Sequence, residues 1–348
     1  MTSAIPSTLT RSQFAAFVGL LVLGLALNAQ SLDLTEDVWR FRIGDFTEAR
    51  DPDFDDSRWQ RVSVPHTWNA LDAQDGKPRT GEYRPSGYRR TAAWYRREVT
   101  IPEHYAGQRT YLRGEGASLV KHAYVNGQFV GTHSGAFTAF CFDITGAVEP
   151  GETATIAIRV DNSQHPSRST YELDLESGRK TLDIMPLRGD FNLYGGIYRH
   201  LELRLKPPVA ISATDHASSG VYVTTPVVSR EAAEVQVETV LSVAEGAAAP
   251  AELAARLFDA SGQLVAEARR VIQAEDGARE RLRLHVDSPR LWQGVEDPYL
   301  YQLEVSVTDK ETELRDMVRE RIGIRRLVFD PERGFVLNGK SLKLRGVN

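Results

Sequence analysis

The feature that most constrains the fold is a succession of short runs in which apolar and polar residues alternate, separated by turn formers. Residues 39–43 alternate and are followed by Gly44-Asp45, and residues 155–160 are followed by Asp161-Asn162-Ser163. Alternation with period two is typical of strands that bury one face. No helical periodicity accompanies these runs from Ser31 onward, so the sequence predicts an all-β protein.

Two Asn-Gly pairs lie between alternating runs, Asn126-Gly127 and Asn338-Gly339, and the second is followed by an expected strand over residues 341–344. This pair is the strongest short-range signal for a β-hairpin. The many short strands before Pro207-Pro208 favour a jelly-roll β-sandwich. The strands that follow this stiff break suit an immunoglobulin-like β-sandwich, although the disulfide of antibody domains is excluded because Cys141 is the only cysteine.

Composition narrows the functional classes. The net charge of −5 argues against nucleic acid as a partner, because such proteins present a basic face. The histidines are scattered, so their spacing suggests no metal site. Cys141 lies between Phe140 and Phe142, and we expect it to be a buried apolar residue without a catalytic role.

The N-terminus differs from the rest of the chain. Arg11 precedes an apolar run over residues 14–27, and small or polar residues follow it. The run is shorter than the roughly 20 residues of a membrane span. Its order predicts a signal peptide over residues 1–29, cleaved after Ala29, and a secreted or periplasmic protein. An uncleaved N-terminal anchor is the alternative, since Leu27 is not the small residue preferred at such a site.

The most informative stretch runs from Asp190 to Arg199 and contains Gly195-Gly196. Glycine permits positive φ angles and the close approach of other groups. The carboxylate of Asp190, the amide of Asn192 and the ring of Tyr194 could bind a polyhydroxylated ligand by hydrogen bonds and stacking. The simpler interpretation is that the polar residues cap a turn and the tyrosines are core.

The sequence Asp-Phe-Asn-Leu-Tyr-Gly-Gly-Ile-Tyr-Arg also resembles the sugar-binding-domain motif of glycoside hydrolase family 2, the family of β-galactosidases, β-glucuronidases and β-mannosidases. Further segments resemble the family pattern in the same order along residues 32–348. They are residues 56–62, 65–68, 94–96, 124–131, 142–145, 160–163, 298–301, 334–340 and 343–348.

The resemblance implies a jelly-roll sugar-binding domain over residues 31–206, an immunoglobulin-like sandwich over 207–325, and the start of a (β/α)8 barrel over 326–348. Such enzymes cleave terminal β-linked sugars with retention, using two carboxylates about 5 Å apart. In the family both are glutamates on barrel strands, and a barrel takes about 250 residues. We therefore expect the catalytic residues to lie outside this sequence, a truncated part of a longer enzyme that is inactive alone.

The resemblance also assigns binding residues. Asp190 matches an aspartate that contacts the sugar hydroxyls and that in some members helps to hold a cation. Asn192 and Tyr194 are weaker substrate-binding candidates, as is the segment from Pro65 to Asn69 at the rim of the site. Arg199 is more plausible as a structural residue that pairs with a nearby acid. No cofactor is expected apart from such a cation. The expected partner is an oligosaccharide or glycoside, with no nucleic acid and no membrane beyond the signal peptide, and homo-oligomerisation is left open. The alternative function is a stand-alone carbohydrate-binding or adhesion protein.

Overall fold

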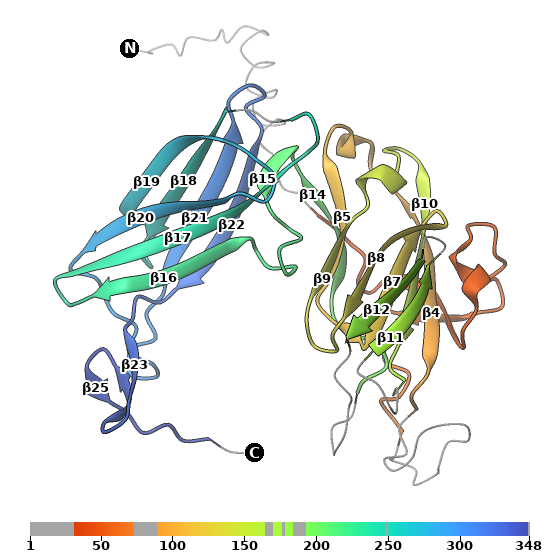
Figure 1. Ribbon diagram of the computed structural model, residues 1–348, viewed down its shortest axis with the longest axis horizontal. Helices are drawn as coiled ribbons and strands as arrows, with labels where there is room; N and C mark the ends of the chain where they lie inside the picture. The colour runs from red at the N-terminus through yellow and green to blue at the C-terminus, as the bar shows by residue number, and fades with distance from the viewer. Residues whose placement is uncertain are drawn as a thin grey trace, which may run out of the picture.

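The computed structural model describes residues 31–72, 89–163, 170–175, 178–183, 193–247 and 250–346. The described chain is almost entirely β-structure, which confirms the all-β prediction. Two β-sandwiches stand side by side, and a small three-stranded sheet projects from the second one (Figure 1). The predicted signal peptide over residues 1–29 lies outside the described residues. Within the described ranges, no helix has the length and apolar character needed to cross a bilayer.

The first sandwich packs a six-stranded sheet against a four-stranded sheet, and every strand pair is antiparallel. The larger sheet has the order β3 (Gln60–Ser63), β2 (Val38–Ile43), β4 (Ala92–Thr100), β10 (Thr153–Asp161), β7 (Val120–Val125), β8 (Gln128–Ser134). The smaller sheet has the order β1 (Ser31–Asp33), β14 (Leu201–Lys206), β5 (Arg109–Gly114), β9 (Phe140–Asp143).

Alternation along these strands builds the core between the two sheets. Trp39 and Tyr95 from the larger sheet are fully buried with Leu112 and Leu203 from the smaller one. The predicted Asn126-Gly127 turn joins β7 to β8, and both residues have positive φ, as a tight hairpin turn requires.

Shorter elements complete the first sandwich. They are β6 (Ala117–Ser118), β13 (Gly196–Ile197), the separate pair β11 (Thr170–Leu175) and β12 (Gly178–Asp183), and the 3-10 turns η1 (Thr47–Arg50), η2 (Glu103–Tyr105) and η3 (Thr145–Ala147). Cys141 on β9 is mostly buried rather than fully buried. Burial raises the pKa of its thiol to about 12, so the thiol is protonated at neutral pH.

The second sandwich begins directly after Pro207-Pro208. One sheet contains β15 (Val209–Ile211), β17 (Ala232–Val243), β16 (Val221–Val228) and β20 (Arg279–Asp287). The other has the order β19 (Leu264–Gln273), β18 (Pro250–Phe258), β21 (Tyr301–Asp309), β22 (Arg315–Ile322). Val235, Leu253, Leu303 and Val305 are fully buried between them, so this sandwich has a core of its own.

The third sheet contains β23 (Leu327–Asp330), β24 (Gly334–Leu337) and β25 (Lys340–Ser341). The predicted second Asn-Gly hairpin is present, with positive φ at Asn338 and Gly339. Its last strand is shorter than expected, because strand pairing ends at Ser341 rather than continuing to Leu344. Phe329 on β23 is 78% exposed, so this sheet leaves one apolar face uncovered by the described residues.

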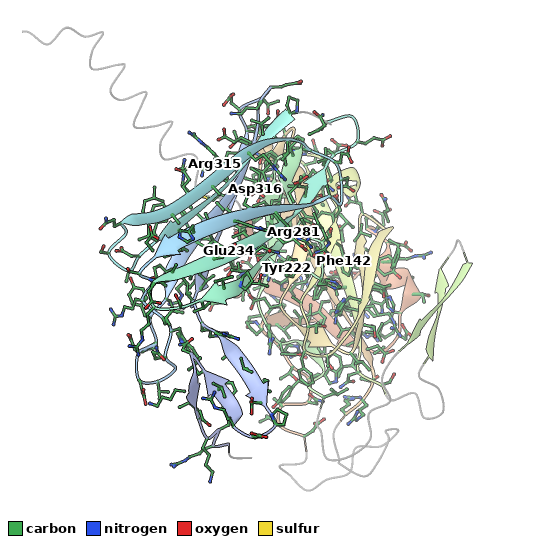
Figure 2. The ribbon with its side chains drawn as sticks, turned by 60° about the vertical axis from the view of Figure 1, so that its left-hand side comes forward. Phe142, Tyr222, Glu234, Arg281, Arg315 and Asp316 are labelled. Atoms are coloured by element: carbon green, nitrogen blue, oxygen red, sulfur yellow. The ribbon has the colours of Figure 1, made fainter. Side chains whose placement is uncertain are left out.

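A buried ion pair joins the two sandwiches. Asp316 on β22 is fully buried, and its Oδ2 accepts hydrogen bonds from Lys206 Nζ at 2.7 Å and from the backbone N–H of Ile211 at 2.9 Å. Lys206 belongs to the first sandwich, whereas Ile211 belongs to the second. Asp316 also lies in the second sandwich (Figure 2). Arg109 adds a second link by donating to Ser242 Oγ.

We expect Asp316→Ala to destabilise the protein by about 3–5 kcal/mol, because it leaves the Lys206 ammonium buried without its partner. Guanidinium-chloride unfolding followed by tryptophan fluorescence measures the loss. Asp287→Ala is the matched control, since this aspartate side chain is 89% exposed. A loss below about 1 kcal/mol, the level of a surface ion pair, would show that the buried pair is not needed.

Candidate functional site

The predicted binding residues fall at the edge of the described structure. Asp190 and Asn192 lie outside the described residues. The cation expected near Asp190 therefore stays a prediction. Tyr194 is described, and its side chain is 48% exposed beside the first sandwich. The structure therefore defines how the segment from Leu193 to Arg199 is held, and through it where the predicted motif leaves the sandwich.

Two buried asparagines clamp the start of this segment. Asn69 and Asn162 are fully buried, and both side-chain amides donate to the carbonyl oxygen of Leu193, at 2.8 and 3.2 Å. Asn69 Oδ1 also accepts the backbone N–H of Gly195 at 2.9 Å. The same two amides bind the carbonyl oxygen of Arg89. Buried backbone groups need such partners, so the clamp fixes the path of the chain on either side of Tyr194.

The Gly195-Gly196 pair lets another segment approach closely. A Cβ atom on Gly195 would lie 2.1 Å from the indole ring of Trp68, and one on Gly196 would lie 2.3 Å from the carbonyl oxygen of His66. Gly196 also has a φ of +130°. The two segments are joined by backbone hydrogen bonds from His66 N to Ile197 O and from Trp68 N to Gly195 O. Both glycines are therefore required by packing.

A histidine–tyrosine pair lies behind the glycines. His66 Nδ1 is 2.7 Å from the hydroxyl oxygen of Tyr95, which is fully buried. Burial lowers the pKa of His66 and raises the pKa of Tyr95 well above its ordinary value. Both side chains are thus neutral near pH 7, and they hold the segment by a neutral hydrogen bond within the core.

The other side of the segment rests on residues 135–137. The Tyr198 hydroxyl donates to the carbonyl oxygen of Ala136, and Arg199 donates to that of Phe137. Lys121 supports this region by donating to the carbonyl oxygens of Ala117 and Gly135. Arg199 therefore has a structural contact, as expected, although its described acceptor is a carbonyl oxygen rather than an acid.

The arrangement leaves an exposed aromatic surface above a rigid base. Tyr194 and Phe137 are 48% and 54% exposed, and the exposed Arg199 lies over the ring of Tyr198. Rings of this kind can stack on the apolar face of a sugar, while the guanidinium can donate to its hydroxyls. The sequence left open whether the tyrosines stack on a ligand or belong to the core. Tyr194 is exposed and Tyr198 is partly buried, so neither interpretation holds for both.

The sequence analysis did not identify Asn69 and Asn162 as the residues that place the motif. Asn162 directly follows β10, and Asn69 lies in the loop after β3. At such positions an asparagine usually indicates a turn. The segment from Pro65 to Asn69 was expected at the rim of the site, but Asn69 is fully buried. The available signal was two asparagines placed after separate strands, and this signal does not reveal that they share one acceptor.

Comparisons with known proteins identify both sandwiches. The family model "Glycosyl hydrolases family 2, sugar binding domain" matches residues 35–207, and the model "Glycosyl hydrolases family 2" matches residues 216–325. The first range contains the clamp and the glycine pair, and the second covers most of the second sandwich.

Individual relatives agree with the family models. A β-glucuronidase of Bacteroides fragilis is 36% identical over 96% of this chain and 43% of its own length. A β-galactosidase of Bacteroides ovatus is 30% identical over 89% of this chain and 33% of its own length. The crystal structure of a Bacteroides uniformis β-glucuronidase superposes with a TM-score of 0.76 and 32% identity, covering 91% of this chain and 35% of that one. The chain thus spans less than half the length of these relatives.

We expect Gly195→Ala to destabilise the first sandwich by about 1–3 kcal/mol, because the added methyl group would overlap the Trp68 ring in a packed region. Thermal or denaturant unfolding measures the loss. Gly146→Ala is the control, since nothing lies within 4 Å of a Cβ atom at that position. Equal stability of the two variants would mean that Trp68 does not pack on the glycine in solution.

The pH dependence of stability tests the burial of Lys121. Burial lowers the pKa of its ammonium group from the ordinary 10.5 to about 7. Between pH 7 and 10.5 the unfolded chain therefore binds more protons than the folded one, and stability must rise with pH. We expect the unfolding free energy of the wild type relative to Lys121→Met to increase by up to about 1.4 kcal/mol per pH unit in this window.

Urea unfolding at pH 6.5, 8 and 9 measures this slope. Lys340→Met is the matched control, since its side chain is 63% exposed. A constant difference between the wild type and Lys121→Met across these pH values would contradict the lowered pKa.

Proposed function

Because the chain belongs to glycosyl hydrolase family 2, we propose that it forms the sugar-binding and immunoglobulin-like part of an exo-acting β-glycosidase of the β-glucuronidase or β-galactosidase type. The observation that carries the proposal is the family match over both sandwiches, together with the clamp that fixes the motif leading to Tyr194. The named relatives support a glycoside as the substrate.

In this proposal the described sandwiches position the sugar and do not cleave it. Retaining hydrolysis requires two carboxylates about 5 Å apart, one acting as nucleophile and one as acid and base. We assign these roles to glutamates of a barrel domain and to no carboxylate of this chain. The relatives are more than twice as long as the segment they share with this chain, which leaves room for such a domain.

Asp190 is proposed to accept hydrogen bonds from the sugar hydroxyls. A charged acceptor makes stronger hydrogen bonds than a neutral one, and it acts with most effect when its backbone is preorganised. The clamp on Leu193 and the glycine pair fix the chain a few residues away. Asn192 and Tyr194 are proposed to bind the same sugar by a hydrogen bond and by stacking.

The predicted signal peptide over residues 1–29 places this activity outside the cytoplasm in our proposal. A secreted or periplasmic enzyme would act on glycosides before their uptake.

We expect Asp190→Ala to lower kcat/KM for the sugar substrate by about 10- to 150-fold in the complete gene product, the loss of about 1.5–3 kcal/mol of charged hydrogen bonding. Hydrolysis of nitrophenyl β-D-glucuronide and β-D-galactoside measures the effect and shows which sugar is preferred. The control is Asp287→Ala, which removes an exposed aspartate of the second sandwich. Unchanged kinetics in Asp190→Ala, or turnover of neither glycoside by the wild type, would contradict the proposal.

A further inference from the structure

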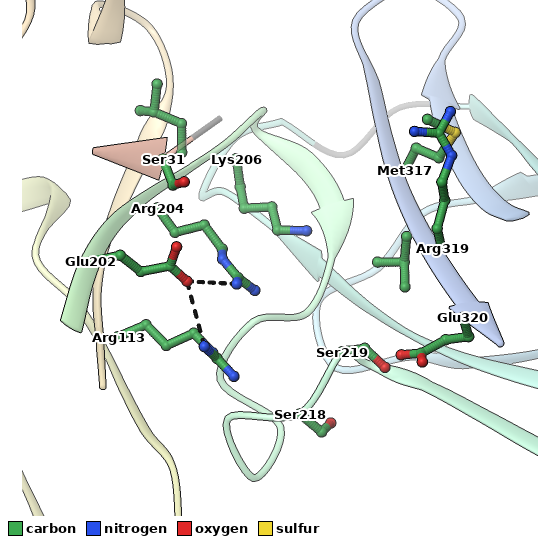
Figure 3. A pocket seen from close by; sticks show the side chains of 12 residues that line it. Ser31, Arg113, Glu202, Arg204, Lys206, Ser218, Ser219, Met317, Arg319 and Glu320 are labelled. Atoms are coloured by element: carbon green, nitrogen blue, oxygen red, sulfur yellow. Dashed lines mark hydrogen bonds and ion pairs between the residues drawn. The ribbon is translucent and has the colours of Figure 1, made fainter. Parts of the chain in front are cut away.

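Two cavities of the described structure are each lined by several arginines. The two cavities differ in how far carboxylates balance the positive charge of their linings. The first, about 470 Å³, lies between the sandwiches, with Glu202, Arg204 and Lys206 of β14 on one wall and Arg319 and Glu320 of β22 on the other (Figure 3). Its cations are balanced by carboxylates. Glu202 binds Arg204 and Arg113, Lys206 binds Asp316, and Arg319 binds Glu304. This cleft has no surplus charge to select a ligand.

The second cavity, about 600 Å³, lies where the second sandwich meets the third sheet. The end of β22, the connection to β23 and one stretch of β16 form its walls. It is lined by Val223, Thr224, Thr225, Pro226, Arg321, Ile322, Gly323, Arg325, Arg326 and Leu327. Three of these residues are arginines and none is acidic. Its volume falls within the range of about 300–1,000 Å³ that is usual for small-molecule sites.

The three guanidinium groups have no carboxylate partner among the described residues. This contrasts with Arg279, Arg281 and Arg290 of the same sandwich, each of which forms an ion pair. Arg321, Arg325 and Arg326 therefore bring like charges to one cavity in a protein whose net charge is −5. Such a concentration of unpaired guanidinium groups favours an anion, which they can bind with paired N–H donors.

The backbone that carries these arginines is fixed at several points. Thr225 Oγ1 donates to the carbonyl oxygen of Arg325 at 2.7 Å, and the N–H of Arg326 donates to Asn338 Oδ1 at 2.9 Å. The Arg325 guanidinium lies 4.7 Å above the ring of Trp292. Stacking of this kind restrains the guanidinium plane and leaves its N–H edge free to donate. The connection that carries Arg325 and Arg326, and the guanidinium plane of Arg325, are thus held in place within the described structure.

We infer that this cavity, between β16 and the connection from β22 to β23, binds the anionic group of an acidic saccharide. Its chemistry is that of a carboxylate or a sulfate ester, held by Arg321, Arg325 and Arg326, with the exposed Thr224 hydroxyl available to a neighbouring sugar hydroxyl. The choice of a saccharide rests on the proposed function, whereas the choice of an anion rests on the arginines alone.

Binding of monosaccharide probes to the 348-residue chain tests the inference without any need for hydrolysis. Isothermal titration calorimetry compares methyl β-D-glucuronide and glucose 6-sulfate with the neutral methyl β-D-glucoside. We expect at least one anionic probe to bind at least tenfold more tightly than the glucoside, and the preferred probe identifies the anionic group. No saturable binding, or equal affinity for the neutral probe, would overturn the inference.

Substitution of the lining arginines tests whether the probe binds in this cavity. Arg321→Gln combined with Arg326→Gln should weaken binding of the anionic probe at least tenfold, and both residues are exposed, so folding should be retained. The matched control is Arg283→Gln, which removes an exposed arginine of the same sandwich. Equal affinity in the double variant and the control would overturn the site. Because hydrolysis is not measured, failure here leaves the proposed function intact, and loss of the proposed function leaves anion binding intact.

Discussion

The placement of the two sandwiches depends on Asp316, a carboxylate removed completely from solvent. Removing a charge from water costs several kcal/mol, and only close partners offset that cost. Asp316 finds them in Lys206 of the first sandwich and in the backbone of Ile211, just after Pro207-Pro208. The carboxylate therefore ties the last strand of one core to the first strand of the next.

The same principle operates around Leu193 with neutral groups. The carbonyl oxygen of Leu193 is satisfied by Asn69 and Asn162, which arrive from segments far apart in the chain. Their amides restrain the backbone beside Tyr194, while the tyrosine itself remains exposed. Rigid support beneath exposed side chains is the arrangement expected of a binding surface, since the entropy of ordering is lost on folding rather than on binding. The arginine-lined cavity follows the same pattern, because hydrogen bonds and stacking restrain the connection that carries its donors.

Much of the fold was predictable because its signals are local. Alternation predicted the strands, and both Asn-Gly pairs form the expected hairpin turns, since positive φ at two successive residues is a property of the dipeptide itself. The last strand was overestimated because alternation in residues 341–344 says nothing of whether a neighbouring strand is present to pair with it. The candidate site was predictable only in outline. The motif from Asp190 to Arg199 was recognised, but the role of Asn69 was not, because Leu193 and Gly195, which it holds, are more than a hundred residues away.

The sequence by itself determined the class of the fold, the hairpin turns and membership of the family, because each of these is written in neighbouring residues or in motifs with a fixed order. Tertiary structure alone decided which polar residues are buried and shared. It made Asn69 and Asn162 a clamp and brought Lys206 to Asp316. It also left three arginines around one cavity with no carboxylate partner among the described residues. The physical reason is that the free energy of a charge or an amide depends on solvent and partners, and those are set by chain segments that the sequence does not place side by side.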